Sequence, residues 1–226
     1  MSLLNNVVVV AADPTRTRSS FLLQSPAMAD LGFWRLAEAD RDRLALVGPD
    51  GSERTAGELL DRANQIAHGL RALGLETGDT VALLLPNGIE LIETYLGAMQ
   101  IGLYVTPINW HLVGPEIAYI LSDSDAKVLV AHERFAAAAL AATEEAGFPT
   151  GADGRAYAVG AIDGFRPYAE LSDGQPATAP EGRTTGAAMH YTSGTTGRPK
   201  GVKRGLFEID PSDMGELLTM LPGLFG

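Results

Sequence analysis

Hydrophobic positions in the first half of the chain recur at two periods, one typical of helices and one typical of buried strands. One set lies three or four residues apart and indicates an amphipathic helix that ends at Gly74. Its members are Leu59, Ala63, Ile66, Ala67, Leu70 and Leu73. Just before this set, Thr55 and Glu58 have the spacing of a capping box, in which a threonine hydroxyl and a glutamate three residues later satisfy each other's backbone amides.

Short apolar runs and helical patterns then alternate along the chain. The runs that predict strands are 44–47, 80–85, 103–108, 127–131, 156–160 and 187–191. The segments that predict further helices are 89–99, 114–122 and 133–147, the second opened by Pro115, a residue favoured at a first helical position. Strands that are apolar throughout and joined by helices indicate an α/β fold, with a mostly parallel sheet covered by helices on both faces.

Three segments fall outside this alternation. Residues 1–30 are irregular and rich in Ser, Thr and Arg, and we expect a leader arm in front of a folded unit that spans 31–226. Residues 164–186 are rich in proline, glycine and acidic residues, which predicts a surface loop leading to the next strand. Residues 217–225 are apolar and lack a helix cap or polar tail, which favours a chain that forms the N-terminal part of a larger protein.

Composition narrows the possible functions. The chain has 226 residues and a net charge of −11, which disfavours broad contact with nucleic acid or anionic lipid. It contains no cysteine, which excludes a disulfide scaffold and a thiolate metal site and favours a reducing cytoplasm. The apolar run at 7–12 is too short for a membrane span, so we expect no membrane-spanning segment.

One stretch carries a recognisable chemical pattern, residues 191–202, which read YTSGTTGRPKGV. Glycines allow backbone N–H groups to approach a ligand closely, and hydroxyl side chains can donate to phosphate oxygens. Lys200 adds a mobile positive charge, and Pro199 restricts the backbone beside it. The pattern therefore predicts a loop that binds a polyphosphate.

Two other interpretations of this stretch are less consistent with its residues. A flexible Ser/Thr/Gly linker is similar in composition, but such linkers rarely end in Arg-Pro-Lys-Gly-Val or follow a buried strand directly. A Walker A loop requires glycine before its lysine and serine or threonine after it. Here Pro199 precedes Lys200 and Gly201 follows it, so the Walker A interpretation fails.

The stretch resembles the signature loop of the adenylate-forming superfamily, which includes acyl- and aryl-CoA synthetases, luciferases and peptide-synthetase adenylation domains. Three upstream segments resemble the same family, so that the similarity covers about 31–202. They are 78–87 (GDTVALLLPN), 97–109 (GAMQIGLYVTPIN) and 116–126 (EIAYILSDSDA). The Pro-Ile-Asn at 107–109 is closer to the acyl-CoA synthetase or fatty-acid–CoA ligase branch than to peptide-synthetase domains.

The resemblance implies a two-step reaction and its small-molecule partners. A carboxylic acid attacks the α-phosphorus of ATP to give acyl-AMP and pyrophosphate, and a thiol, usually coenzyme A, then displaces AMP; Mg²⁺ accompanies the phosphates. By the same resemblance Lys200 is catalytic, and seven residues are expected to bind ATP by stabilising the departing pyrophosphate. These are Thr192, Ser193, Gly194, Thr195, Thr196, Gly197 and Lys200.

The match is incomplete, and two hypotheses remain open. Family members are more than twice as long, so the second half of the N-terminal domain and the small C-terminal domain are expected to be absent, and with them the metal-associated and ribose-binding residues. The first hypothesis is the N-terminal part of a carboxylic-acid–thiol ligase, inactive by itself; the second is a truncated, non-catalytic nucleotide-binding or structural module of the same fold. Lys203 and Arg204 replace a Ser-His pair common in relatives, and they either add positive potential or lie at an exposed strand edge.

The four histidines have no metal-ligand spacing between any pair. His190 adjoins the loop, but a packed or hydrogen-bonded role is expected from its apolar neighbours rather than a role as a base. Trp110 and His111 are expected to cap or pack, with lining of a cleft as the alternative.

Overall fold

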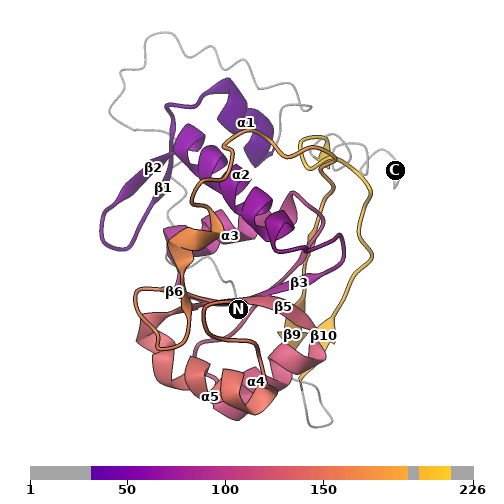
Figure 1. Cartoon of the computed structure of the whole chain (residues 1–226). Helices are drawn as coiled ribbons and strands as arrows, with labels where there is room; N and C mark the ends of the chain where they lie inside the picture. Colours follow the sequence, from indigo (N-terminus) through magenta and orange to yellow (C-terminus); the bar gives the residue numbers. More distant parts are fainter. Residues whose placement is uncertain (1–31, 193–198, 215–226) are drawn as a thin grey trace.

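The computed structural model describes residues 32–192 and 199–214. Its centre is a sheet of six strands enclosed between two layers of helices (Figure 1). All the strand pairs within this sheet are parallel, in the spatial order β7-β6-β5-β3-β4-β8. The strands are β3 (Thr80–Leu84), β4 (Tyr104–Pro107), β5 (Ala126–His132), β6 (Ala156–Val159), β7 (Arg166–Pro167) and β8 (Ala187–Ala188). The predicted α/β class is confirmed.

The helices cover both faces of the sheet, as the apolar strands predicted. In Figure 1, α2 and α3 lie above the sheet, and α4 and α5 lie below it. Their bounds are α2 (Ala56–Ala72), α3 (Ile89–Met99), α4 (Gly114–Asp123) and α5 (Ala136–Ala146). The predicted helix at 133–147 begins instead as a 3₁₀ turn, η2 (Glu133–Phe135).

Strand β3 shows why the sheet is buried on both sides. Its side chains alternate between the two faces of the sheet. Val81 and Leu83 pack into the core between the sheet and α2 and α3, whereas Ala82 and Leu84 pack into the core between the sheet and α4 and α5. Every residue of β3 is buried. At about 25 cal/mol per Å² of apolar surface, burial on two faces makes this strand a principal source of stability.

A smaller unit precedes the sheet. Helix α1 (Phe33–Ala39) packs on α2, and strands β1 (Leu44–Val47) and β2 (Glu53–Thr55) form an antiparallel hairpin that leads into α2. The predicted capping box is present. The backbone N–H of Glu58 donates to the hydroxyl of Thr55 over 3.2 Å, and the backbone N–H of Thr55 donates to the Glu58 carboxylate over 2.9 Å.

Two segments differ from the expectation. The stretch at 164–186 is not only a surface loop, because it contains β7 and the 3₁₀ turn η3 (Tyr168–Leu171), whose Tyr168 and Leu171 are buried against α2 and α3. The strand expected at 187–191 is divided into two parts. Its first part is β8, in the sheet, and the rest belongs to β9 (His190–Thr192), which pairs with β10 (Lys200–Val202) outside the sheet.

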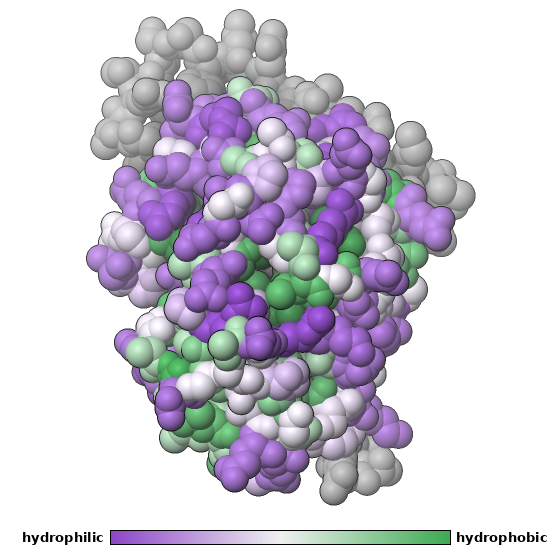
Figure 2. Space-filling model, in the orientation of Figure 1, coloured by the Kyte–Doolittle hydropathy of each residue, from purple (hydrophilic) through white to green (hydrophobic). Residues whose placement is uncertain are grey.

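The surface differs between the two layers. In the view of Figure 2 the upper half, over α2, is mainly hydrophilic, and hydrophobic side chains are more frequent in the lower half, over α4 and α5. Among the residues that the structure describes, no helix has the length and apolar character needed to cross a membrane. The leader arm expected at 1–30 and the apolar segment at 217–225 lie outside the described residues.

Candidate functional site: a hairpin with one exposed face and a cavity at the opposite sheet edge

The residues of the signature stretch that the structure describes form an antiparallel hairpin. In its register Thr192 lies opposite Lys200, and Tyr191 lies opposite Gly201. Because side chains alternate along a strand, Thr192 and Lys200 share one face of the hairpin and Tyr191 has the other. Both Thr192 and Lys200 are exposed, and no described side chain pairs with the Lys200 ammonium. The exposed face therefore presents a hydroxyl beside a mobile positive charge.

The remaining predicted ATP-binding residues connect these two strands. They are Ser193, Gly194, Thr195, Thr196 and Gly197, and they lie outside the described residues. The structure accordingly brings together Thr192 and Lys200 at the two ends of the predicted loop.

The opposite face of the hairpin packs against the core. The ring of Tyr191 packs with the cluster under α4 and α5, and its hydroxyl donates to the Asp123 carboxylate over 2.7 Å. Burial, together with the hydrogen bond and negative charge of Asp123, raises the pKa of Tyr191 above its usual range. Tyr191 therefore stays neutral at physiological pH and serves as a hydrogen-bond donor.

Gly201 has a packing role that the sequence did not reveal. A Cβ at this position would come within 2.9 Å of the Tyr191 ring and 2.3 Å of the Met189 side chain. The absence of a side chain at Gly201 is what allows the Tyr191 ring to lie across the neighbouring strand. Of the three glycines in the stretch, Gly201 is thus explained by close packing rather than by ligand binding.

The chain after β10 is fixed to the sheet by Lys203. Its ammonium lies 4.4 Å from the centroid of the Tyr104 ring and donates to the carbonyl of Gly78 over 3.3 Å. The Tyr104 hydroxyl in turn donates to the carbonyl of Arg204. The sequence left open added positive potential or an exposed strand edge for Lys203, and the structure shows a third role, in which its ammonium anchors the chain to Tyr104 and Gly78.

His190 was expected to be packed or hydrogen-bonded rather than to act as a base, and the structure shows that it is not packed. It is exposed and lies on the same hairpin face as Thr192 and Lys200, opposite Val202. The reason is that β9 leaves the sheet after β8, so the apolar neighbours of His190 in the sequence do not enclose it.

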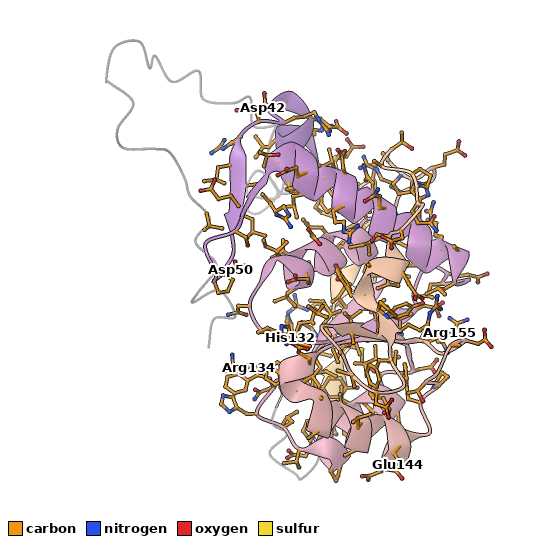
Figure 3. The ribbon with its side chains drawn as sticks, turned by 60° about the vertical axis from the view of Figure 1, so that its left-hand side comes forward. Asp42, Asp50, His132, Arg134, Glu144 and Arg155 are labelled. Atoms are coloured by element: carbon orange, nitrogen blue, oxygen red, sulfur yellow. The ribbon has the colours of Figure 1, made fainter. Side chains whose placement is uncertain are left out.

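A separate cavity of about 730 Å³ lies at the carboxyl edge of the sheet. Its walls come from the β1–β2 turn and from the segments that follow β3, β4 and β5. The lining residues include Asp50, Asn87, Glu90, Trp110, His132 and Arg134. None of the described lining residues belongs to β9 or β10. Figure 3 shows Asp50, His132 and Arg134 on the same side of the molecule, whereas Arg155, which precedes β6, lies on the opposite side.

The strand order explains the position of this cavity. The connection from β3 leads to β4 on one side, and the connection from β5 leads to β6 on the other side. Between β3 and β5 the two connections diverge, which leaves a crevice at their carboxyl ends; open α/β sheets bind ligands at this kind of switch point. Polar and aromatic residues follow each of these strands closely in the sequence, among them Asn87, Trp110 and Arg134. These residues could have indicated a site, but they were not grouped as one from the sequence.

Stacked rings form one wall of the cavity. Trp110 stacks on His111 with centroids 3.5 Å apart and on Phe135 at 5.7 Å, and the guanidinium of Arg134 lies 5.8 Å from the Trp110 ring. Trp110 remains 45% exposed. Trp110 therefore both packs and lines a cleft. In this wall the positively charged guanidinium of Arg134 lies over a planar ring.

The cavity also has polar features. The hydroxyl and the backbone N–H of Ser52 both donate to the Asp50 carboxylate, and these bonds lower the pKa of Asp50. Nδ1 of His132 accepts from the backbone N–H of Arg134 over 3.0 Å. Among the described residues no group of three or more His, Cys, Asp or Glu side chains could hold a metal ion.

Comparisons with known proteins agree with the fold and show the family. Long-chain-fatty-acid–CoA ligase FadD13 of Mycobacterium tuberculosis is 36% identical over 165 residues, which are 70% of this chain and 31% of the relative. Feruloyl-CoA synthase of an Amycolatopsis species is 35% identical over 174 residues, which are 76% of this chain and 32% of the relative. The chain thus spans about a third of the length of these curated relatives.

Solved structures give the same result. The anthranilate CoA ligase AuaEII, crystallised with anthranoyl-AMP, superposes with a TM-score of 0.65 at 27% identity, over 77% of this chain and 34% of that one. The N-terminal domain of FACL13 from Mycobacterium tuberculosis superposes with a TM-score of 0.60 at 31% identity, over 77% of this chain and 42% of that one. The family profile described as "AMP-binding enzyme" matches residues 33–205. This chain therefore belongs to the AMP-binding, adenylate-forming enzyme family, and its relatives are acyl-CoA ligases.

Proposed function

We propose that this chain is the N-terminal part of an ATP-dependent acid–thiol ligase that converts a carboxylic acid, of the fatty or a related acyl class, to acyl-AMP and then to acyl-CoA. The observation that carries the proposal is the exposed face of the β9–β10 hairpin, where Thr192 and Lys200 lie opposite each other at the ends of the signature loop. We further propose the N-terminal 30 residues as a leader arm, 31–226 as the partial N-terminal domain, and the cytoplasm as the compartment.

The chemistry of this face suits a triphosphate. Lys200 carries its charge on a flexible stem and has no described partner to neutralise it, so the charge is available to phosphate oxygens. The hydroxyl of Thr192 is a donor for the same ligand. In the proposed reaction these groups, with Ser193, Gly194, Thr195, Thr196 and Gly197, stabilise the negative charge that develops on the leaving pyrophosphate. Lys200 acts as the catalytic group among them.

Magnesium fits this arrangement without a cage of protein ligands. Mg²⁺ in nucleotide sites is held largely by phosphate oxygens and water, with one or two carboxylates at most. It would supply charge neutralisation at the phosphates.

We also propose that the cavity at the sheet edge takes the nucleotide end of the thiol substrate, coenzyme A. A purine can pack against the exposed part of Trp110, and the guanidinium of Arg134, which lies over the Trp110 ring, suits a phosphate. The volume of about 730 Å³ lies within the range of small-ligand sites.

The proposal is tested by titrating Mg²⁺-tripolyphosphate into the chain and following backbone amide signals by NMR. We expect saturable shifts at Thr192 and Lys200 and a binding constant weakened about tenfold or more by Lys200→Ala, because a charged hydrogen bond is worth about 1.5–3 kcal/mol. Lys203→Ala is the matched control, since it removes the same charge three residues away but from an ammonium that is held by Tyr104 and Gly78.

If Lys200→Ala and Lys203→Ala lose affinity equally, Lys200 contributes only general positive charge and makes no specific contact with the phosphates. No binding by the wild-type chain would refute the phosphate-binding role of the hairpin. We expect the chain alone to release no pyrophosphate from ATP when fatty, aromatic and branched acids are supplied, because it spans about a third of its relatives. Measurable release would contradict the proposal that the chain is inactive without the rest of the enzyme.

A further inference from the structure

Helix α4 contacts the hairpin through two side chains one turn apart, Tyr119 and Asp123. Residues four apart lie on the same face of a helix, and here the Tyr119 hydroxyl is 3.2 Å from one carboxylate oxygen of Asp123. The other carboxylate oxygen accepts the hydrogen bond from Tyr191 of β9. The Tyr119 hydroxyl also lies 3.0 Å from the carbonyl oxygen of Pro199, just before β10.

These contacts reach both ends of the signature loop. Tyr191 directly precedes Thr192, the last residue of β9, and Pro199 directly precedes Lys200, the first residue of β10. Because Tyr119 has one hydroxyl proton, this proton is shared between two acceptors, and the shorter distance is the one to Pro199. Asp123 and Tyr119 therefore connect one helix to the strand before the loop and to the strand after it.

The location of Asp123 is unusual for a carboxylate. It is the last residue of α4, where the partial negative charge of the helix C-terminus disfavours an acidic side chain by a few tenths of a kcal/mol to about 1 kcal/mol. The hydrogen bond from Tyr191, together with the shared proton of Tyr119, compensates this cost. The Tyr119 and Tyr191 rings also meet edge to face, with centroids 6.4 Å apart.

We propose that Tyr119 and Asp123 are positioning residues that hold the two ends of the hairpin in register and so set the relative placement of Thr192 and Lys200. We assign them no contact with the substrates, because they act through Tyr191 and the Pro199 carbonyl. This inference rests on the proposed function, because the placement matters chemically only when the hairpin binds a polyphosphate. A bound group has to meet both ends at once, and a small change in their geometry weakens its binding.

The test compares Tyr119→Phe and Asp123→Asn with the wild-type chain in two measurements. The first is hydrogen exchange of the backbone amides of β9 and β10, which we expect to accelerate in both variants. The second is the NMR titration with Mg²⁺-tripolyphosphate, in which we expect affinity to fall about two- to tenfold, the range that corresponds to the net contribution of one typical hydrogen bond.

Tyr168→Phe is the matched control. It removes the same hydroxyl from a tyrosine that is buried under α3, where it bonds Thr94 over 3.0 Å, and it makes no described contact with the hairpin. We expect it to lower the unfolding midpoint and to leave both the hairpin exchange and the phosphate affinity unchanged.

Each outcome bears on the inference. Unchanged affinity in Tyr119→Phe and Asp123→Asn, with Lys200→Ala still weakening binding, would overturn this inference and leave the proposed function intact. An equal loss of affinity in Tyr168→Phe would also overturn it, because the effect would then follow from general stability. No binding of Mg²⁺-tripolyphosphate by the wild-type chain would contradict the proposed function, and the positioning role would be lost with it.

Discussion

The ring of Tyr191 lies directly across the hairpin from Gly201, and a Cβ at Gly201 would come within 2.9 Å of that ring. The two residues therefore form a pair in which the missing side chain of one makes room for the other. This pairing turns the Tyr191 hydroxyl toward Asp123 and leaves the opposite hairpin face free for Thr192 and Lys200. The close contact between Tyr191 and Gly201 therefore explains both why the Tyr191 face of the hairpin is packed and why the face with Thr192 and Lys200 is exposed.

Gly201→Ala is expected to destabilise the hairpin by about 1–3 kcal/mol, because the new methyl group displaces the Tyr191 ring and weakens its bond to Asp123. Chemical denaturation and hydrogen exchange of β9 and β10 measure the effect. Gly205→Ala is the control, since a Cβ there meets nothing within 4 Å.

A double-mutant cycle identifies the cause of this loss. Once the hydroxyl is removed by Tyr191→Phe, Gly201→Ala has less to disrupt, so the two changes should be non-additive by at least about 0.5 kcal/mol. Strict additivity would mean that the methyl group acts on something other than the Tyr191–Asp123 bond.

Gly69→Ala is expected to destabilise the chain although alanine is the better helix former. In the interior of α2 the exchange gains up to about 1 kcal/mol in helix propensity. A Cβ at Gly69 would, however, lie 1.6 Å from the backbone carbonyl oxygen of Leu171, so η3 has to move away from α2. We expect a net loss of about 2 kcal/mol or more in the free energy of unfolding, measured by urea denaturation.

A second variant shows whether the backbone contact is responsible. The obstacle at Gly69 is the carbonyl of Leu171 and not its side chain, so adding Leu171→Ala should fail to rescue Gly69→Ala. Rescue, or a Gly69→Ala variant more stable than the wild type, would show that α2 and η3 are not packed this closely.

The sequence predicted the elements that depend on local pattern, and missed those that depend on distant partners. Strand β3 and the capping box of α2 follow from residues within a few positions of one another. The contact between Tyr191 and Asp123 joins residues 68 positions apart, and no local period reveals it. Similarly, the polar composition around Tyr168 suggested a surface loop, whereas its burial depends on a space between α2 and α3 that exists only in the folded chain.

The candidate site also has one part that the sequence predicted and one part that it did not. The signature residues Thr192 and Lys200 were recognisable because glycines, hydroxyls and a lysine are adjacent in the sequence. The cavity was not, since Trp110 and Arg134 follow β4 and β5 of the central sheet, and Asp50 comes from the turn of the separate β1–β2 hairpin, and only the folded chain brings them together.

Coenzyme A is expected to quench the fluorescence of Trp110. The chain has two tryptophans, so Trp34→Phe leaves Trp110 as the only reporter. Saturable quenching by coenzyme A is expected, because stacking of a purine on the indole changes its emission, and pantetheine, which lacks the nucleotide, is expected to leave it unchanged. Arg134→Ala should weaken the binding about tenfold if its guanidinium meets a phosphate. Quenching by pantetheine equal to that by coenzyme A would place the nucleotide elsewhere.

Glu93 is expected to make the stability of the chain depend on pH. Its carboxylate is buried in α3, and burial raises its pKa from the ordinary 4.5 to about 7 despite Arg62 and Arg54, whose side chains lie 3.7 Å away. Both distances are longer than a hydrogen bond, so the arginines do not compensate the loss of hydration. Near Glu93 lie also the carboxylate of Glu90 and the hydroxyl of Tyr168, the latter 3.4 Å away.

The direction in which stability changes with pH follows from proton uptake by Glu93. Between pH 4.5 and about 7 the folded chain holds a proton on Glu93 that the unfolded chain has lost, so the stabilisation is complete below pH 4.5 and disappears as the pH rises to about 7. At about 1.4 kcal/mol per pH unit the loss is on the order of 3 kcal/mol.

Urea denaturation of wild type and Glu93→Gln from pH 5 to 8 measures this loss. The free energy of unfolding of the wild type should fall relative to that of Glu93→Gln as the pH rises, while the exposed Glu144→Gln should follow the wild type. Parallel curves for wild type and Glu93→Gln would mean that Glu93 is ionised in the folded chain throughout this range.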